Sequence, residues 1–135
     1  MPVRYRDALI KDKEKASLVV TIDPKEPCLL LYQDHEWQCI ETKLQQLPSF
    51  NEAARRIQRL LIGHANDVDL DNHGRMLLPA LLRDYAKLEK HVVLIGQGNK
   101  FEIWAESIWE QRREQWLAEE SVKESIPEEM KTFSL

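Results

Sequence analysis

The chain has 135 residues, of which 43% are hydrophobic and 31% charged, and its formal net charge at pH 7 is −4. This composition is typical of a globular domain, and the acidic balance argues against a uniformly basic nucleic-acid-binding surface. No apolar run approaches the roughly 20 residues of a membrane span and no signal-peptide pattern opens the chain, so we expect a cytoplasmic protein without a membrane partner.

The charge is unevenly distributed along the chain. Residues 1–16 carry five basic against three acidic side chains, whereas residues 117–135 carry five glutamates against two lysines. Apart from this acidic tail, residues 1–116 therefore have a net charge near −1. Local basic patches can bind DNA despite the acidic tail. The two cysteines, Cys28 and Cys39, do not suggest a disulfide framework.

The first half of the chain alternates between strand and helix patterns. Residues 2–10 predict a short helix, and the β-branched and apolar runs at 17–23 and 28–32 predict a hairpin. An amphipathic helix with Asp34 as its N-cap is expected to reach about residue 47. Pro48 ends it, and a capping box of Ser49 and Glu52 predicts the start of a helix over 49–62. The inner face of that second helix is predicted to comprise Ala53, Ile57, Leu60 and Leu61.

The middle of the chain, Asp69 to Arg75, carries the most informative local pattern. Alternating apolar residues before it and an apolar run at 76–78 after it predict a strand, a tight turn and a strand. Asp71 can accept hydrogen bonds from backbone N–H groups two or three residues later, and Gly74 can supply a positive φ. Arg75 would then project from a braced loop, with a guanidinium suited to phosphate or a guanine edge. Local chemistry alone nevertheless favours an ordinary surface arginine in a hairpin turn.

The second half of the chain repeats the element order of the first. A proline-led short helix at 79–86, strands at 91–96 and 100–104 and a helix at 107–118 parallel residues 2–47. We therefore predict a tandem duplication around a pseudo-two-fold axis, with the strands of both copies sharing one small barrel. The predicted division is a first repeat at 1–47, a linking helix at 48–63, a second repeat at 64–121 and a mobile acidic tail at 122–135.

Three other readings of the residues are less favoured. A metal site among His64, Asp67, Asp69, Asp71 and His73 lacks the spacing of calcium or zinc ligands, so no metal or cofactor is expected. Cys28 or Cys39 with His35 lacks an oxyanion motif, and we do not expect an enzyme or a small-molecule substrate. The tryptophans of the second half are better explained as core and interface than as base-stacking platforms; they are Trp104, Trp109 and Trp116.

The sequence resembles the MraZ family over nearly its whole length to about residue 118. Asp71-Asn72-His73-Gly74-Arg75 fits the D-x-x-G-R signature of that family, and supporting matches lie at 4–6, 27–37, 55–65 and 96–104. The family carries this signature in each of two repeats, whereas here the first repeat begins without it. We therefore expect an N-terminally incomplete first repeat, and the coding sequence upstream of Met1 would test that expectation.

The resemblance implies an α+β fold, a tandem-repeat pseudo-two-fold β-barrel of the AbrB-like swapped-hairpin type with short flanking helices. It also implies a transcriptional regulator, expected here to be a repressor, of the bacterial division and cell-wall gene cluster. Such a protein would bind promoter direct repeats in double-stranded DNA as a ring-like homo-oligomer associated with the nucleoid. Arg75 carries over as the family's DNA contact. Our candidate interface adds flanking and basic side chains: Asn72, His73, Arg4, Arg6 and Arg83.

Two alternatives remain at this point. Lacking its first hairpin signature, the chain could be an oligomeric assembly module with little DNA binding. An AbrB-type antitoxin is a weaker option, because such antitoxins usually have a single copy of the unit that is duplicated here.

Overall fold

The computed structural model describes residues 16–73 and 75–119. These fall into two units that divide after Ala105. The first unit contains a five-stranded antiparallel sheet and three helices, so the chain is α+β as predicted. Its strands are β1 (Ala16–Ile22), β2 (Leu29–Gln33), β3 (Asn66–Leu70), β4 (Val92–Gly96) and β5 (Phe101–Ala105). Its helices are α2 (Asp34–Gln45), α3 (Glu52–Gly63) and α4 (Ala80–Tyr85).

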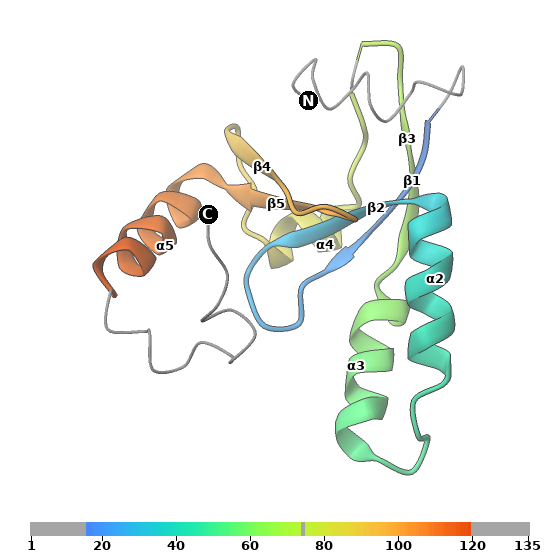
Figure 1. Ribbon diagram of the computed structural model, residues 1–135. Helices are drawn as coiled ribbons and strands as arrows, with labels where there is room; N and C mark the ends of the chain where they lie inside the picture. Colours follow the sequence, from blue (N-terminus) through green and yellow to red (C-terminus); the bar gives the residue numbers. More distant parts are fainter. Residues whose placement is uncertain (1–15, 74, 120–135) are drawn as a thin grey trace. The chain divides into compact units, whose positions relative to one another are not determined.

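The strand order of the sheet is β3-β1-β2-β5-β4 (Figure 1). The hairpins β1–β2 and β4–β5 lie side by side, and β3 is added at the edge next to β1. The hairpins β1–β2 and β4–β5 each have five registered residue pairs, whereas the β2–β5 junction between them has three. The predicted hairpins at 17–32 and 91–104 are confirmed. Because β3 and β4 form the two edges among the described strands, closure of the sheet into a barrel stays a prediction.

Each hairpin turn is closed by the residues that the sequence places there. In the first turn the N–H of Asp23 donates to the carbonyl of Cys28 at 3.0 Å. In the second, the N–H of Gln97 donates to the carbonyl of Lys100 at 2.8 Å, and Gly98 adopts a φ of +80°. That backbone conformation is sterically costly for residues with a Cβ atom, which explains the glycine.

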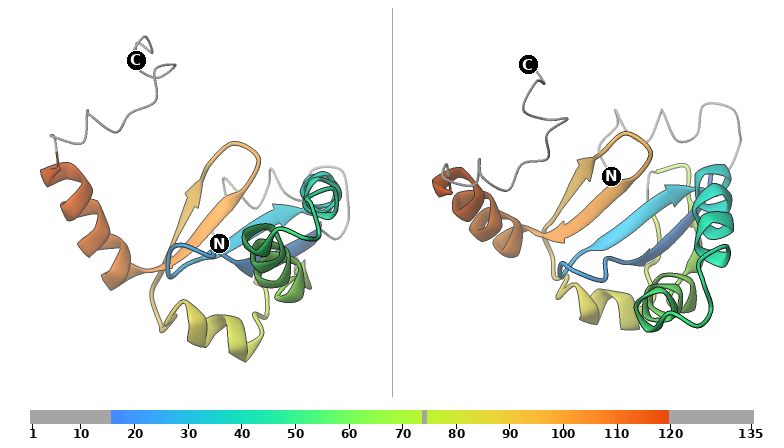
Figure 2. Two further views of the ribbon diagram at one scale, coloured as in Figure 1. Left: turned by 90° about the horizontal axis from the view of Figure 1, so that it is seen from below. Right: turned by 60° about the horizontal axis from the view of Figure 1, so that its bottom comes forward.

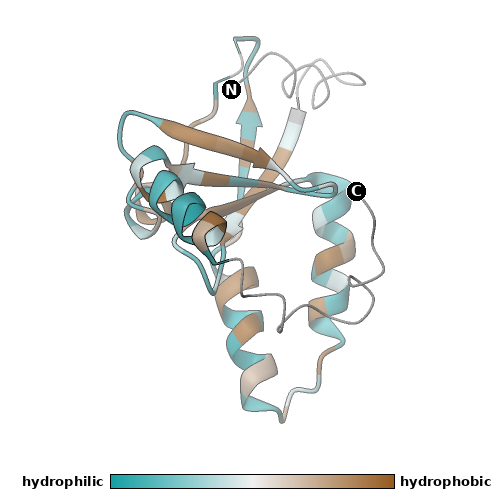
Figure 3. Ribbon diagram, turned by 60° about the vertical axis from the view of Figure 1, so that its left-hand side comes forward, coloured by the Kyte–Doolittle hydropathy of each residue, from teal (hydrophilic) through white to brown (hydrophobic). Residues whose placement is uncertain are grey.

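The two faces of the sheet carry separate hydrophobic clusters, as the period-two alternation of a strand requires. On one face Leu18, Val20 and Ile22 pack with Leu82 and Ala86, which belong to α4 and the residue that caps it. On the other face Val19, Leu30 and Tyr32 pack with residues of α2, Trp37 and Leu44. Figure 2 shows α2, α3 and α4 around the sheet, and Figure 3 shows long hydrophobic stretches in several of the strands.

Helices α2 and α3 confirm the predicted helical regions but not their predicted caps. The N-cap of α2 is Gln33, without a side-chain hydrogen bond, so the assignment of Asp34 as the N-cap was wrong. The N-cap of α3 is Asn51, whose Oδ1 accepts the N–H of Ala54 at 3.1 Å, so the capping box of Ser49 and Glu52 was also wrong. The N–H of Asn51 donates to the carbonyl of Pro48 at 3.2 Å, and this extra turn moves the helix start to Glu52.

The buried side of α3 also differs in part from the predicted one. Ala54 is buried, whereas Ala53 and Ile57, both predicted to lie on the inner face, are exposed. The prediction held for Leu60 and Leu61, which pack against the two hydrophobic clusters. Two hydrogen bonds fix the helix: the buried Thr21 hydroxyl donates to the Leu61 carbonyl, and Gln58 Nε2 donates to the Leu44 carbonyl, both at 2.6 Å.

The central segment differs from the predicted strand–turn–strand hairpin. Asn66–Leu70 forms strand β3, but residues 75–79 form no strand. The partner of β3 is β1, with Leu18 opposite Val68. This long-range pairing provides β3 with the backbone hydrogen bonds that we expected residues 76–78 to provide. Met76 and Leu78 instead pack against the cluster around α4, and Leu77 is exposed.

The second unit, from Glu106 onward, is described up to residue 119 and contains helix α5 (Glu106–Ala118). The helix begins one residue before the predicted range of 107–118 and ends where predicted. None of its residues is fully buried, and Trp109 and Trp116 pack edge to face with ring centroids 5.9 Å apart. Among the described residues, no helix combines the length and the apolarity that a membrane crossing demands.

Candidate nucleic-acid interface

The segment Asp71–Arg75 directly follows β3 and is braced by the side chain of its first residue. Asp71 Oδ1 accepts the backbone N–H of His73 at 2.9 Å and that of Arg75 at 2.8 Å. The N–H of Asp71 in turn donates to the Arg75 carbonyl at 2.9 Å. The predicted role of Asp71 is thus confirmed, with acceptance from the second and fourth following residues rather than from the second and third.

These hydrogen bonds account for the acidity of the Asp71 carboxyl group. The backbone N–H of Arg75 and then that of His73 hold the pKa of Asp71 below its ordinary value of 3.8, and the charges of both side chains act in the same direction. Donors aimed at a carboxylate favour its charged form. The loop is therefore most firmly held when Asp71 is ionised.

The structure presents the predicted contact residues of this loop to solvent. Asn72, His73 and Arg75 are all exposed, and Figure 1 shows the segment after β3 turning back at the top of the view, away from α3. Gly74 lies outside the described residues. An exposed guanidinium on a backbone held by two charge-assisted hydrogen bonds is well suited to contact an anionic surface.

The other predicted contacts are not gathered at this loop. Arg83 is exposed on α4, a separate element, and Arg4 and Arg6 lie outside the described residues. The arginines of α3, Arg55, Arg56 and Arg59, are exposed, as expected of a solvated helix face. The structure therefore brings Asn72, His73 and Arg75 together and leaves Arg83 elsewhere on the same unit.

Among the described residues, the histidine and tryptophans considered for alternative sites have other partners or other places in the fold. The ring Nδ1 of His64 lies 2.8 Å from the Leu60 carbonyl, which ties this side chain to the end of α3. Trp104 is 1% exposed and belongs to the core, as expected, whereas Trp116 in α5 is 46% exposed. Sequence reasoning missed a different group, Asp23, Cys28 and Glu102, whose donor atoms lie within 4.8 Å of one another.

Replacing Asp71 tests how much of the loop depends on its carboxylate. Asp71→Ala is expected to remove the protection of the His73 and Arg75 amides from hydrogen exchange, while Asp71→Asn keeps an acceptor oxygen and retains part of it. The folded-state pKa is lowered, so in the unmodified chain the protection is complete above about pH 4 and is lost as the pH falls through that lowered value. Amide exchange followed by NMR would check both effects; equal protection in the two variants and the unmodified chain would contradict the bracing role.

Comparison with known proteins identifies relatives along the whole chain. A family model described as "MraZ protein, putative antitoxin-like" matches residues 1–60 and again 61–133. A protein of Legionella pneumophila (strain Corby) named "Transcriptional regulator MraZ" is 66% identical over 136 residues, which cover all of this chain and 89% of the relative. Proteins of the same name from Coxiella burnetii (strain Dugway 5J108-111) and Hydrogenovibrio crunogenus are 53% and 47% identical, covering all of this chain and 89% and 88% of each relative.

Proposed function

The chain belongs to the MraZ family, and on that premise we propose that it regulates transcription by binding double-stranded DNA through the loop Asp71–Arg75. The relatives carry the name transcriptional regulator, which points to a regulator rather than an enzyme. For this chain the proposal is supported by the structure of the loop. Its backbone is held by one carboxylate, and its arginine is exposed.

The chemistry of the loop matches the edge of a guanine base. A guanidinium can donate two parallel hydrogen bonds to guanine O6 and N7 in the major groove, which is worth about 1–3 kcal/mol of discrimination. Asn72 and His73 stand beside Arg75 in the sequence and are equally exposed, so they can contact neighbouring bases or phosphates. Arg83, Arg4 and Arg6 are proposed to hold phosphates and set the register, without reading sequence.

Two observations support a duplicated, swapped-hairpin architecture for this chain. The family model matches two successive segments, and the predicted repeats at 1–47 and 64–121, joined by 48–63, fall largely within them. Strand β3 belongs to the second matched segment but pairs with β1 of the first. Such an exchange of strands between repeats is what a pseudo-two-fold, AbrB-like barrel requires. The predicted acidic tail at 122–135 lies outside the described residues.

The Asp-x-x-Gly-Arg loop at 71–75 suggests how specificity is gained. One bidentate contact discriminates weakly, but a ring-like homo-oligomer would offer several Arg75 side chains to successive direct repeats, raising affinity through effective concentration. Leu77 and Leu81 are 87% and 66% exposed, which leaves apolar surface for contact between copies. The proposed target is the promoter of the division and cell-wall gene cluster, where the protein would act as a repressor on nucleoid DNA.

Salt dependence of binding tests the proposed function. We expect retardation of promoter DNA that carries direct repeats, with affinity falling steeply as salt rises because phosphate contacts release counterions. DNA of the same length with scrambled repeats should bind more weakly at every salt concentration. Equal affinity for both DNAs would contradict sequence-specific binding. The absence of retardation even at low salt would contradict DNA binding altogether.

The exposed apolar side chains also favour a second candidate, an assembly module with little affinity for DNA. Light scattering on the same samples distinguishes the two functions. Oligomers that form but do not retard the repeat-bearing DNA would support the assembly module, whereas oligomers that bind it specifically would support the regulator.

A further inference from the structure

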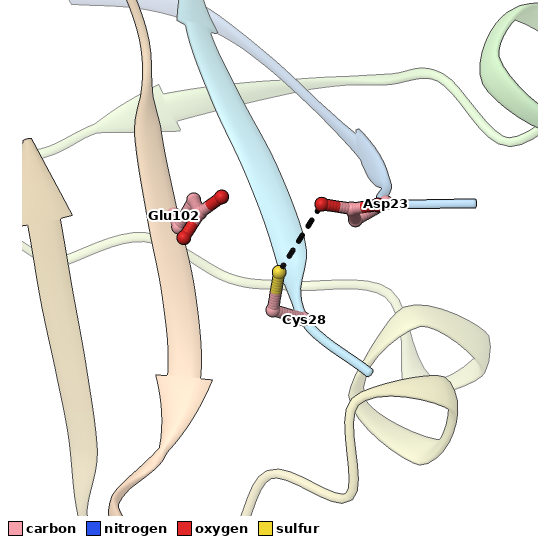
Figure 4. Close-up of side chains that lie close together, drawn as sticks. All are labelled: Asp23, Cys28 and Glu102. Carbon is pink, nitrogen blue, oxygen red and sulfur yellow. Dashed lines mark hydrogen bonds between the residues drawn. The ribbon is translucent and has the colours of Figure 1, made fainter. Parts of the chain in front are cut away.

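Three side chains with metal-binding donor atoms converge where the turn of the first hairpin meets strand β5. Asp23 follows β1, Cys28 precedes β2, and Glu102 lies on β5. A carboxylate oxygen of Asp23, the Cys28 Sγ and a carboxylate oxygen of Glu102 all lie within 4.8 Å of one another. Figure 4 shows the two carboxylates on either side of the Cys28 sulfur.

The strand register explains why residues so distant in sequence meet. Leu30 pairs with Glu102 across the β2–β5 junction, and Cys28 is two residues before Leu30. Because side chains alternate along a strand, Cys28 and Glu102 lie on the same face of the sheet. Asp23 is brought in by the turn that returns the chain from β1 to β2.

Both carboxylates accept hydrogen bonds from neighbouring groups, and that of Asp23 also faces the sulfur. Asp23 Oδ1 accepts the N–H groups of Lys25 and Glu26 at 2.9 and 3.2 Å, while its Oδ2 lies 3.7 Å from Cys28 Sγ. Glu102 Oε1 accepts the indole N–H of Trp104 at 2.9 Å. The positions of the donors are therefore fixed by neighbouring backbone and core groups.

Without a cation, the surroundings of this cluster keep the Cys28 thiol in its neutral, protonated form. Cys28 is 0% exposed, and burial, then the charge of Asp23, then that of Glu102 raise the pKa of its thiol well above the ordinary value. Each influence on this thiol, including its hydrogen bond to Asp23 and the charge of Glu26, acts in the same direction. A divalent cation would reverse that balance, since it stabilises a thiolate and neutralises the carboxylates together.

We propose that Asp23, Cys28 and Glu102 form a binding site for a divalent cation of borderline softness, with Zn²⁺ as the best match. One sulfur and two carboxylate oxygens suit Zn²⁺, whereas Mg²⁺ and Ca²⁺ prefer all-oxygen sites. Three protein ligands leave a fourth tetrahedral position for water. On binding, the S–H bond of Cys28 breaks, its proton passes to solvent, and a sulfur–metal bond forms.

The position of the site suggests a structural consequence. Asp23 and Cys28 belong to the first hairpin and Glu102 to the second, so one cation would cross-link the two hairpins. The β2–β5 junction that joins these hairpins has the fewest registered pairs of the sheet. Metal binding is therefore expected to stabilise the folded chain at its least extensively paired junction.

Titration of the reduced, chelator-treated full chain with Co²⁺ and Zn²⁺ tests this site. We expect one Co²⁺ per chain with a thiolate-to-metal charge-transfer band, displacement of Co²⁺ by Zn²⁺, release of the thiol proton and a rise in Tm. Cys28→Ser should abolish the band, and Glu102→Gln should weaken binding more than about tenfold while leaving the thiol in place.

Cys39→Ser is the matched control, because Cys39 is also a free cysteine but lies exposed on α2. It should bind Co²⁺ like the unmodified chain. The proposal is overturned if the band survives in Cys28→Ser and disappears in Cys39→Ser, if Glu102→Gln binds with unchanged affinity, or if no thiolate band forms with the unmodified chain. Should Cys28→Ser fail to fold, Glu102→Gln still decides the outcome.

Discussion

Arg75→Ala is expected to lower the affinity of the protein for DNA with direct repeats by at least about tenfold, with the fold unchanged. The side chain is exposed, so its removal creates no cavity, whereas the backbone N–H that holds the loop remains. If several loops of an oligomer bind together, the losses at each loop combine and the effect grows. Gel retardation at one fixed salt concentration, with circular dichroism to verify the fold, measures both parts of the prediction.

Two further variants distinguish recognition of base edges from general electrostatic attraction to DNA. Arg75→Lys keeps a positive charge but loses the planar fork, so it should retain binding to scrambled DNA and lose the preference for the repeats. Arg56→Ala removes an equally exposed arginine from α3 and should bind as the unmodified chain does. Loss of binding in Arg56→Ala alone would place the interface on α3 and contradict the role of the Asp71–Arg75 loop.

The elements that could be predicted from sequence are those specified by local chemistry. Strands β1, β2, β4 and β5 follow from β-branched and apolar runs, and their hairpin partners are the nearest in sequence. The bracing of the loop by Asp71 was predictable for the same reason, since both accepted N–H groups lie within four residues. In each of these cases the sequence neighbours are also the structural partners.

The predictions were wrong where two local sequence signals competed, or where the structural partner of a segment lies far away in the sequence. Ser49 and Asn51 are both good N-cap residues, and the turn after Pro48 decided for Asn51. The apolar segment 76–78 follows β3 closely in the sequence, but β3 pairs instead with β1, about 50 residues earlier. No local sequence pattern indicates a strand partner so far away. The group of Asp23, Cys28 and Glu102 has no motif spacing, because strand register alone brings Glu102 to the other two.

Trp104→Ala is expected to be among the most destabilising single substitutions in the sheet, lowering the free energy of unfolding by about 3–5 kcal/mol. Trp104 is 1% exposed on β5, so truncation leaves a large cavity that the neighbouring strands can fill only in part. It also deprives Glu102 of the indole N–H that its carboxylate accepts. Since domains of this size are stable by only about 5–15 kcal/mol, a large part of the chain's stability would be lost. Urea denaturation followed by circular dichroism measures the change.

Two controls assign this loss to the buried ring rather than to the removal of any aromatic side chain. Phe50→Ala removes a side chain that is 89% exposed and should change stability by less than about 0.5 kcal/mol. Trp104→Phe keeps most of the ring volume but removes the N–H donor to Glu102, so its cost should fall between those of the other two variants. If Trp104→Ala were no more destabilising than Phe50→Ala, the β4–β5 hairpin would not pack on the first hairpin as the β2–β5 register requires, and the joint placement of Glu102 with Cys28 would fail with it.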